Sequence, residues 1–157
     1  MSQKIVVRNF SSKDLKAVQE ILFRYSSPTG RIWSEDMVKE MMNNASTEQP
    51  DGVFVAEIGG KVVGFAIVVY REWFGIAYLD YIQTKAEWTK KGIGHRLIQK
   101  CVSWAREKGA RIIYTETGRN NDRAIKFYQK HDFRITGYIP DYYQKGLDAV
   151  ILVKRLC

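Results

Sequence analysis

The sequence predicts an α/β fold in which a mixed β-sheet carries helices on its faces. Segments typical of strands and helices follow one another in the order βααβββαβαββ. Gly59-Gly60 separates two β-rich runs as in a tight hairpin, and the strand–helix–strand step over residues 76–116 is typical of a right-handed parallel crossover. With 157 residues, of which 45% are hydrophobic, the chain can bury a sizeable core, and we expect a single domain spanning residues 1–157.

The first strand and the first helix are predicted near the N-terminus. Lys4–Phe10 is typical of a short strand, and Ser11 and Asp14 follow it at the spacing of a capping box, which starts a helix. Pro28-Thr29-Gly30 ends this helix. Its apolar stripe at helical spacing consists of Leu15, Val18, Leu22 and Tyr25.

The second helix is predicted to begin after Trp33-Ser34. Ser34 is a favourable N-cap residue, and Glu35 and Asp36 stand in the first turn, where the helix dipole favours negative charge. Met37 and Met41 lie on one face of this helix.

Three strands and the longest helix follow. The strands are expected at Val53–Ile58, Lys61–Tyr70 and Gly75–Thr84. The helix is predicted from Lys91 or Gly92 through Lys108, and Gly109 ends it. Its inward face consists of Ile93, Leu97, Cys101 and Trp104 or Ala105.

The last part of the chain completes the sheet. Arg111–Glu116 is a predicted strand, and a helix is expected from about Asn121 to Lys130. Two closing strands, Phe133–Ile139 and Leu147–Leu156, flank a polar loop.

Charge and composition narrow the class of protein. The net charge is +8, and residues 85–111 alone contribute +6, which favours an anionic partner such as a nucleic acid, a membrane surface or a phosphorylated cofactor. No apolar run approaches the roughly 20 residues of a membrane span, and Met1 to Asn9 lacks the apolar core of a secretory signal. Cys101 and Cys157 show neither metal-binding nor CxxC spacing, so we expect a cytoplasmic protein without a metal.

A short glycine loop, Gly92-Ile93-Gly94, stands between the fourth strand and the longest helix. Free N–H groups at a helix N-terminus attract phosphate, although the same glycines also suit an ordinary turn. A dinucleotide fingerprint would need a third glycine where Leu97 stands, and the Gly-Lys-Ser/Thr of a P-loop is absent. The loop therefore suits a pyrophosphate, with Lys90, Lys91 and Arg96 nearby as counter-charge.

This loop resembles the acetyl-CoA pyrophosphate loop of the GNAT N-acetyltransferases, usually Gln/Arg-x-x-Gly-x-Gly/Ala. The segment from Asn121 through Ala124 and Tyr128 to Phe133 is similar to the Asn-x-x-Ala-x-x-x-Tyr-x-x-x-Gly-Phe motif of that superfamily. Within it, the chain looks like the ribosomal-protein N-terminal alanine acetyltransferases and their archaeal relatives. Three features support this likeness: Trp33-Ser34 before the second helix, Glu116 five residues ahead of Asn121, and Tyr142-Tyr143 ahead of Asp148-Ala149.

The resemblance implies a fold and a co-substrate. The fold is a mixed, mostly antiparallel seven-stranded sheet with splayed central strands and about four helices on its faces. The co-substrate is acetyl-CoA, and no metal is needed. The residues that the resemblance places at the cofactor are Ile82, Gln83, Thr84, Thr89, Lys90, Lys91, Gly92, Ile93, Gly94, His95, Arg96, Asn121, Ala124, Phe127 and Tyr128.

Three positions depart from the family pattern. Thr89 stands where Gln or Arg is usual, which weakens one phosphate contact unless Lys90 or Lys91 compensates. Asp132 replaces a glycine at a position that favours positive φ. Leu147 stands where the subfamily tends to have an acid, which bears on the substrate more than on the fold.

Acetyl transfer from a thioester to an amine needs a base for the amine proton and an acid for the leaving thiolate. Glu116, at the end of its strand, is the first candidate for the base, and Asp80 on the preceding strand is the second; a surface ion pair is the structural alternative for Glu116. Tyr128 is the candidate acid, because a phenol pKa of about 10 exceeds that of a thiol, whereas a tyrosine on a helix face otherwise packs in a core. Asn121 both caps its helix and, by resemblance, contacts the pantetheine arm. A backbone N–H near Ile82–Thr84 would polarise the carbonyl.

The acceptor cleft is expected between aromatic residues, and Asp80 is placed with them as a substrate-binding residue. Tyr142 and Tyr143, in the final hairpin loop, resemble residues that clamp the backbone of a substrate peptide, and hairpin packing is the alternative for each. Trp33 lines the same cleft or staples its helix. His95 and His131 have no partner at the spacing of a metal site or triad, and Cys101 is expected in the core with Cys157 exposed.

The expected function is N-acetylation of a protein or peptide N-terminus by a monomer or homodimer. Within the same chemistry, the acceptor alternatives are a lysine side chain, a polyamine or another small amine. A nucleic-acid-binding module is disfavoured, because the basic residues of the longest helix interleave with its apolar stripe as on a solvated face and no reader motif is present. A catalytically dead CoA-binding domain is the remaining alternative, and the retention of Glu116 and Tyr128 argues against it.

Overall fold

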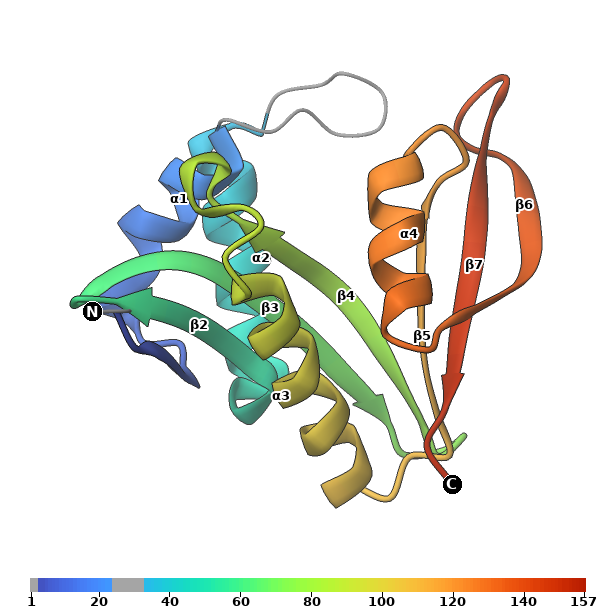
Figure 1. Cartoon of the computed structure of the whole chain (residues 1–157), viewed down its shortest axis with the longest axis horizontal. Coiled ribbons are helices and arrows are strands. Elements are labelled where there is room, and N and C mark those ends of the chain that lie inside the picture. The colour runs from blue at the N-terminus through green and yellow to red at the C-terminus, as the bar shows by residue number, and fades with distance from the viewer. Residues whose placement is uncertain (1–2, 24–32) are drawn as a thin grey trace.

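The computed structural model describes residues 3–23 and 33–157. A seven-stranded sheet has the order β1-β2-β3-β4-β5-β7-β6, and Figure 1 shows helices on both of its faces. The strands are β1 Ile5–Asn9, β2 Val53–Ile58, β3 Lys61–Arg71, β4 Ile76–Thr84, β5 Ile112–Gly118, β6 Arg134–Gln144 and β7 Leu147–Arg155. The helices are α1 Leu15–Phe23, α2 Glu35–Glu48, α3 Ile93–Glu107 and α4 Asp122–Lys130.

The predicted mixed sheet and helix order are confirmed. All neighbouring strands pair antiparallel except β4 and β5, which are parallel and joined through α3. Tyr25 and Pro28-Thr29-Gly30 lie outside the described residues. Among the described helices, none is long and apolar enough to cross a membrane.

The helix starts follow the predicted capping. The Ser11 N–H donates to Oδ2 of Asp14 at 2.9 Å in a capping box that begins the turn before α1. The Ser34 Oγ accepts the Met37 N–H at 3.2 Å at the start of α2. At the start of α4, Oδ1 of Asn121 accepts the Ala124 N–H at 3.2 Å. These side chains satisfy N–H groups that a helix leaves without partners, which stabilises each helix start.

Two strand boundaries differ from the prediction. Glu116 lies inside β5 rather than at its end, because Thr117 and Gly118 continue to pair with β7. Strand β6 extends to Gln144, so that Tyr142 and Tyr143 belong to this strand and not to a hairpin loop. Irregularities in the β6–β7 register absorb the residues that predicted a loop, since pairing resumes at Gln144↔Leu147.

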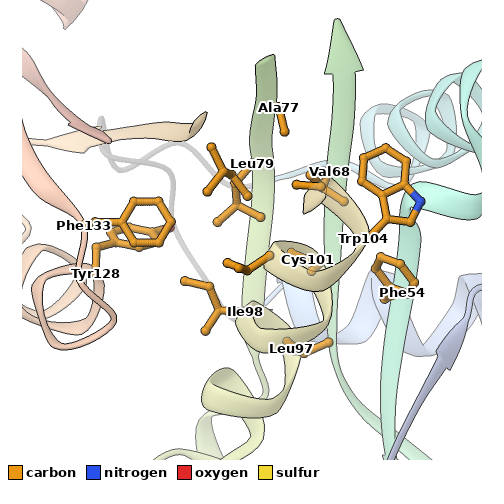
Figure 2. Close-up of a cluster of buried hydrophobic side chains, with 14 of the residues drawn as sticks. Phe54, Val68, Ala77, Leu79, Leu97, Ile98, Cys101, Trp104, Tyr128 and Phe133 are labelled. Carbon is orange, nitrogen blue, oxygen red and sulfur yellow. The ribbon is translucent and has the colours of Figure 1, made fainter. Parts of the chain in front are cut away.

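The two faces of the sheet carry separate hydrophobic cores. One core packs the face covered by α3 and α4 and is shown in Figure 2, where Leu97 and Cys101 of α3 lie over Phe54 and Val68 of the sheet. The other packs α1 and α2 against β2 and β3. The side chain of Cys101 is fully buried, as predicted, and Cys157 is exposed.

Strands β4 and β5 separate along their length. They pair only at Ala77↔Ile113 and Tyr78↔Tyr114. Beyond these pairs β4 continues its backbone ladder with β3 alone and β5 with β7 alone, and Figure 1 shows the two strands diverging. The Thr115 hydroxyl donates to the Leu79 carbonyl at 2.9 Å where the separation begins. The central strands are thus splayed into a wedge, hereafter the β4–β5 wedge.

Candidate active site

The β4–β5 wedge separates two groups of candidate residues, one on each face of the sheet. Ala77, Leu79 and Ile113 point into the core under α3 and α4. Because strand side chains alternate between faces, Tyr78 and Glu116 point to the opposite face. Tyr128 of α4 belongs to the α3/α4 core. The candidate base and the candidate acid therefore approach the wedge from opposite faces.

Glu116 has a close hydrogen-bond partner that the sequence analysis missed. The Tyr78 hydroxyl donates to Oε1 of Glu116 at 2.5 Å. Partial burial raises the pKa of the Glu116 carboxyl above its ordinary value, the nearby Asp80 adds to this rise, and the hydrogen bond from Tyr78 opposes it. Among the described residues, Glu116 forms no ion pair, so the surface ion pair considered from the sequence is not seen there. A half-buried carboxyl with a raised pKa is suited to accept a proton near neutral pH.

Tyr142 and Tyr143 lie beside Glu116. Their rings form an edge-to-face pair with centroids 4.9 Å apart. Burial raises the pKa of each phenol, and the charge of the Glu116 carboxylate is the next largest cause. The strand β6 thus brings the two predicted acceptor residues to the same carboxylate.

Trp33 lies beside β4 on the α1/α2 face. Its ring meets the Tyr81 ring edge-to-face at 5.6 Å, and Tyr81 stacks on Phe65 at 5.5 Å. Burial raises the pKa of Tyr81 to about 12. Trp33 therefore packs partly against the helix-covered core while remaining half-exposed; its place in the acceptor cleft stays a prediction.

Asp80 is the extra residue of a β-bulge in β4. In the pairing with β3, Tyr81 lies opposite Ile67 and Leu79 opposite Val68, so Asp80 has no partner in the ladder. Its side chain is exposed. Partial loss of solvent raises the pKa of its carboxyl, and the charge of Arg71 opposes the rise. Bulges re-aim side chains beside active sites, and this one places Asp80 near Glu116.

Tyr128 is buried at the other side of the wedge, with 7% of the residue exposed. Its ring contacts Phe127 and Phe133 at centroid distances of 5.4 and 5.5 Å, and Figure 2 shows Tyr128 and Phe133 together, facing Leu79 and Ile98. Burial raises the pKa of Tyr128, and the Glu116 carboxylate adds to this rise. The phenol therefore keeps its proton at neutral pH, as an acid must.

The glycine loop stands at the N-terminus of α3, as predicted. Gly92 caps the helix in the left-handed region with φ 85, where glycine is strongly favoured. A Cβ on Gly94 would lie 3.1 Å from the Phe127 ring, so this position keeps α3 close to α4. The first turn of a helix leaves backbone N–H groups for an anion, which fits a pyrophosphate.

The side chains in and beside the glycine loop differ in how accessible they are to a cofactor. Ile93 is buried in the core, so only its backbone faces a cofactor. The Thr89 hydroxyl donates to the Ala86 carbonyl at 3.0 Å. The exposed cations beside the loop are Lys90, Lys91 and Arg96. Lys91 lies 5.8 Å from the Trp88 ring centroid.

The two histidines meet, which sequence spacing did not predict. Nδ1 of His95 lies 2.9 Å from Nε2 of His131, and Nδ1 of His131 lies 2.8 Å from the Phe127 carbonyl oxygen. The contact joins the first turn of α3 to the end of α4. Asp132 follows with φ 67, the positive value expected at this helix end.

The remaining predicted cofactor residues surround the same wedge. Nδ2 of Asn121 donates to the Thr117 hydroxyl at 3.3 Å while its Oδ1 caps α4. Ala124 and Phe127 are partly buried on the α4 side, and Ile82, Gln83 and Thr84 form the half-buried end of β4. Acetyl-CoA thus fits the residues present: helix N–H groups, nearby cations and a sheet opening between β4 and β5.

Tyr78 could not be identified from sequence spacing. It stands 38 residues before Glu116, and only the parallel register Tyr78↔Tyr114 brings them together. The alternation of β4 does place Tyr78 on the face opposite to Ala77 and Leu79, which is the signal that was available.

Comparisons with known proteins agree with this geometry. The sequence model described as the acetyltransferase (GNAT) family matches residues 15–133. An uncharacterized N-acetyltransferase of Methanocaldococcus jannaschii is 31% identical, covering 96% of this chain and 92% of its own. Streptothricin acetyltransferase A of Bacillus subtilis is 29% identical over 71% of this chain and 62% of its own length.

Solved structures share the fold over nearly the whole chain. Ard1 from Thermoplasma volcanium has a TM-score of 0.83 at 24% identity, covering 98% of both chains. The ribosomal-protein-S18-alanine N-acetyltransferase from Escherichia coli has a TM-score of 0.79 at 22% identity, covering 98% of this chain and 94% of its own. The structure of yncA from Salmonella typhimurium with its cofactor acetyl-CoA has a TM-score of 0.76 at 18% identity, with the same coverage. With the family match, the wedge and the glycine loop in agreement, this chain belongs to the GNAT acetyltransferase family and is an acetyl-CoA-dependent N-acetyltransferase.

Proposed function

We propose that the acceptor is the α-amine at the N-terminus of a protein or peptide, with Glu116 as base and Tyr128 as acid. The observation that carries the proposal is the hydrogen-bonded Tyr78–Glu116 pair at the β4–β5 wedge, with Tyr142 and Tyr143 beside it. The aromatic side chains offer broad faces to a peptide backbone, and the half-buried carboxyl beside them has the raised pKa that suits it to accept the amine proton. The fold shared with a ribosomal-protein-S18-alanine N-acetyltransferase supports this choice.

Acetyl transfer involves two proton transfers, and the residues proposed for them lie on opposite faces of the sheet. Acetyl-CoA supplies the acetyl group as a thioester, and the amine nitrogen forms a bond to the acetyl carbon as the carbon–sulfur bond breaks. Glu116 takes the proton that the amine loses, directly or through water. Tyr128 gives a proton to the departing thiolate, and both residues recover their starting states by exchange with solvent.

The loop and the wedge hold the reactants for this step. The N–H groups at the start of α3 bind the pyrophosphate, and Lys90 or Lys91 contributes the charge that Thr89 lacks. The β4 backbone near Ile82–Thr84, no longer paired with β5, has N–H groups that can polarise the acetyl carbonyl. Residues of this chain would therefore supply both positioning and charge stabilisation.

A small amine is the second candidate acceptor. The similarity to streptothricin acetyltransferase A favours it, and the exposed Asp80 carboxylate near Glu116 suits a cation. A lysine side chain has the same chemistry but a pKa of about 10.4, against about 8 for an α-amine, so less of it is neutral at pH 7.

The test is CoA release with acetyl-CoA against one mixed panel, with mass spectrometry to locate the acetyl group. The panel contains peptides with free N-termini beginning Ala, Ser, Met–Leu or Met–Glu, the same peptides N-blocked with an internal lysine, and polyamines. Acetylation of the free N-termini alone is the expected result. Transfer only to lysine or polyamine would refute the α-amine assignment, and CoA binding without any transfer would refute catalysis on these acceptors.

A further inference from the structure

The acceptor side of the wedge has two carboxyl groups, but amine deprotonation needs only one. Glu116 is half-buried and accepts a hydrogen bond from Tyr78. Asp80 is exposed, and among the described residues it has no hydrogen bond or ion pair. A structural role in the sheet does not account for Asp80, because it is the residue that the β3–β4 ladder leaves out.

The bulge directs the Asp80 side chain to the face of the sheet that carries Tyr78 and Glu116. Leu79 before it and Ile82 after Tyr81 contact the α3/α4 core, whereas Tyr81 packs on the α1/α2 core. The extra residue lets Asp80 and Tyr81 leave the strand on the same side. Without the bulge, alternation would carry one of them to the opposite face.

The charges around Asp80 agree with this placement. Its charge raises the pKa of Tyr78, Tyr81, Glu116 and Tyr142, so it lies among the groups that line the acceptor side. The described cation that acts on it is Arg71. Arg71 pairs with Ile76 at the other end of β4 and lies 5.9 Å from the Tyr78 ring centroid.

The two carboxylates are suited to different tasks. The amine that attacks must be neutral, so the carboxylate beside it has to take its proton, and Glu116 has the raised pKa and the fixed position for this. An exposed carboxylate without a described hydrogen bond or ion pair is suited instead to a group that keeps its positive charge. Aromatic side chains around such a group add cation–π attraction, and Tyr142 is an exposed aromatic residue within the electrostatic reach of Asp80.

We propose that Asp80 selects acceptors with a second cationic group close to the amine that is acetylated. This inference rests on the proposed acetyl transfer at the same site. The shared chemistry is a guanidinium or ammonium group a few bonds from the reacting amine. It comes either from a basic side chain at the second position of a peptide or from the far amine of a diamine. A chain with net charge +8 would otherwise repel both acceptors, so a local carboxylate matters most for them.

The experiment compares acceptors that differ in one charge and little else. The peptide arm uses Ala-Arg and Ala-citrulline peptides of otherwise identical sequence, since citrulline has nearly the shape of arginine without its charge. The small-molecule arm uses 1,4-diaminobutane and 4-hydroxybutylamine. The variants are Asp80→Asn, which removes the charge and keeps the shape, and Glu72→Gln, a matched control at the exposed turn before β4. The kcat/KM of each acceptor is measured at low and high salt.

We expect the wild-type protein and Glu72→Gln to prefer the charged member of at least one pair by roughly fivefold. Asp80→Asn should lose this preference, because its kcat/KM for the charged member should fall toward its own kcat/KM for the neutral member, and salt should weaken the wild-type preference. The arm that shows the effect identifies the source of the cation.

Three results would overturn the inference. One is a wild-type protein that does not distinguish either pair, and another is a preference that survives in Asp80→Asn. The third is an equal loss on every acceptor in Asp80→Asn, which would make Asp80 the base. Failure of the proposed function is distinguishable. Without acetyl transfer, no primary amine in either arm would be acetylated by any of the three proteins, and a wrong α-amine assignment would leave only the peptide arm unacetylated.

Discussion

Replacing Tyr78 by Phe removes one hydroxyl and leaves the ring, which isolates the hydrogen bond to Glu116. The hydroxyl donates at 2.5 Å to a carboxylate, so it stabilises the charged form of Glu116 and lowers its pKa. A hydrogen bond to a charged group contributes about 1.5–3 kcal/mol, and the lower end applies because the site is half-buried. Since 1.36 kcal/mol corresponds to one pKa unit, the Glu116 pKa should rise by about one unit in Tyr78→Phe.

The assay is a carbon-13 NMR titration of the Glu116 carboxyl, with Glu116→Gln used to assign the resonance. A direct titration is needed because protonation of the acceptor amine, with a pKa near 8, overlaps the acid limb of the rate profile. In Tyr78→Phe, loss of the deprotonated base should also lower kcat most at the acid end of the range. An unchanged or lowered Glu116 pKa would refute the reasoning, because the hydrogen bond would then not stabilise the carboxylate.

Three further predictions follow from the geometry. Tyr128→Phe should lower kcat by roughly 100-fold or more while the Kd for acetyl-CoA changes little, and unchanged turnover would exclude Tyr128 as the acid. Asp14, 4% exposed and bonded to Arg8 at 2.8 and 2.9 Å, has a lowered pKa that is due mainly to Arg8. Asp14→Asn should therefore cost roughly 2–3 kcal/mol in denaturant unfolding at pH 7, with the difference shrinking below about pH 4 as the wild-type loses the charge; a constant difference down to pH 2 would contradict the charge argument. Burial raises the pKa of the Cys101 thiol to about 12, so mass spectrometry after iodoacetamide at pH 8 should show one adduct on Cys157, and two adducts on folded protein would contradict it.

Local signals predicted most of the secondary structure. The caps at Ser11, Ser34 and Asn121 depend on contacts within three residues, and all three are present. Boundaries near the C-terminus were less accurate, because β6 continues through a stretch with Pro140 that favours a loop. Long-range pairing with β7 keeps that stretch in the sheet, and local propensity does not report such pairing.

The sequence by itself determined the order of elements, the glycine loop and the family motif around Asn121 and Tyr128, because each depends on residues that are close along the chain. Only the tertiary structure decided what meets at the wedge. The Tyr78–Glu116 hydrogen bond spans 38 residues and needs the parallel β4–β5 register, and the aim of Asp80 needs a bulge defined by pairing with β3. The contact of His95 with His131 needs α3 and α4 side by side. Strand register and helix packing are properties of the whole folded chain. The individual site residues were therefore predictable from local motifs, whereas the residues that they contact were not.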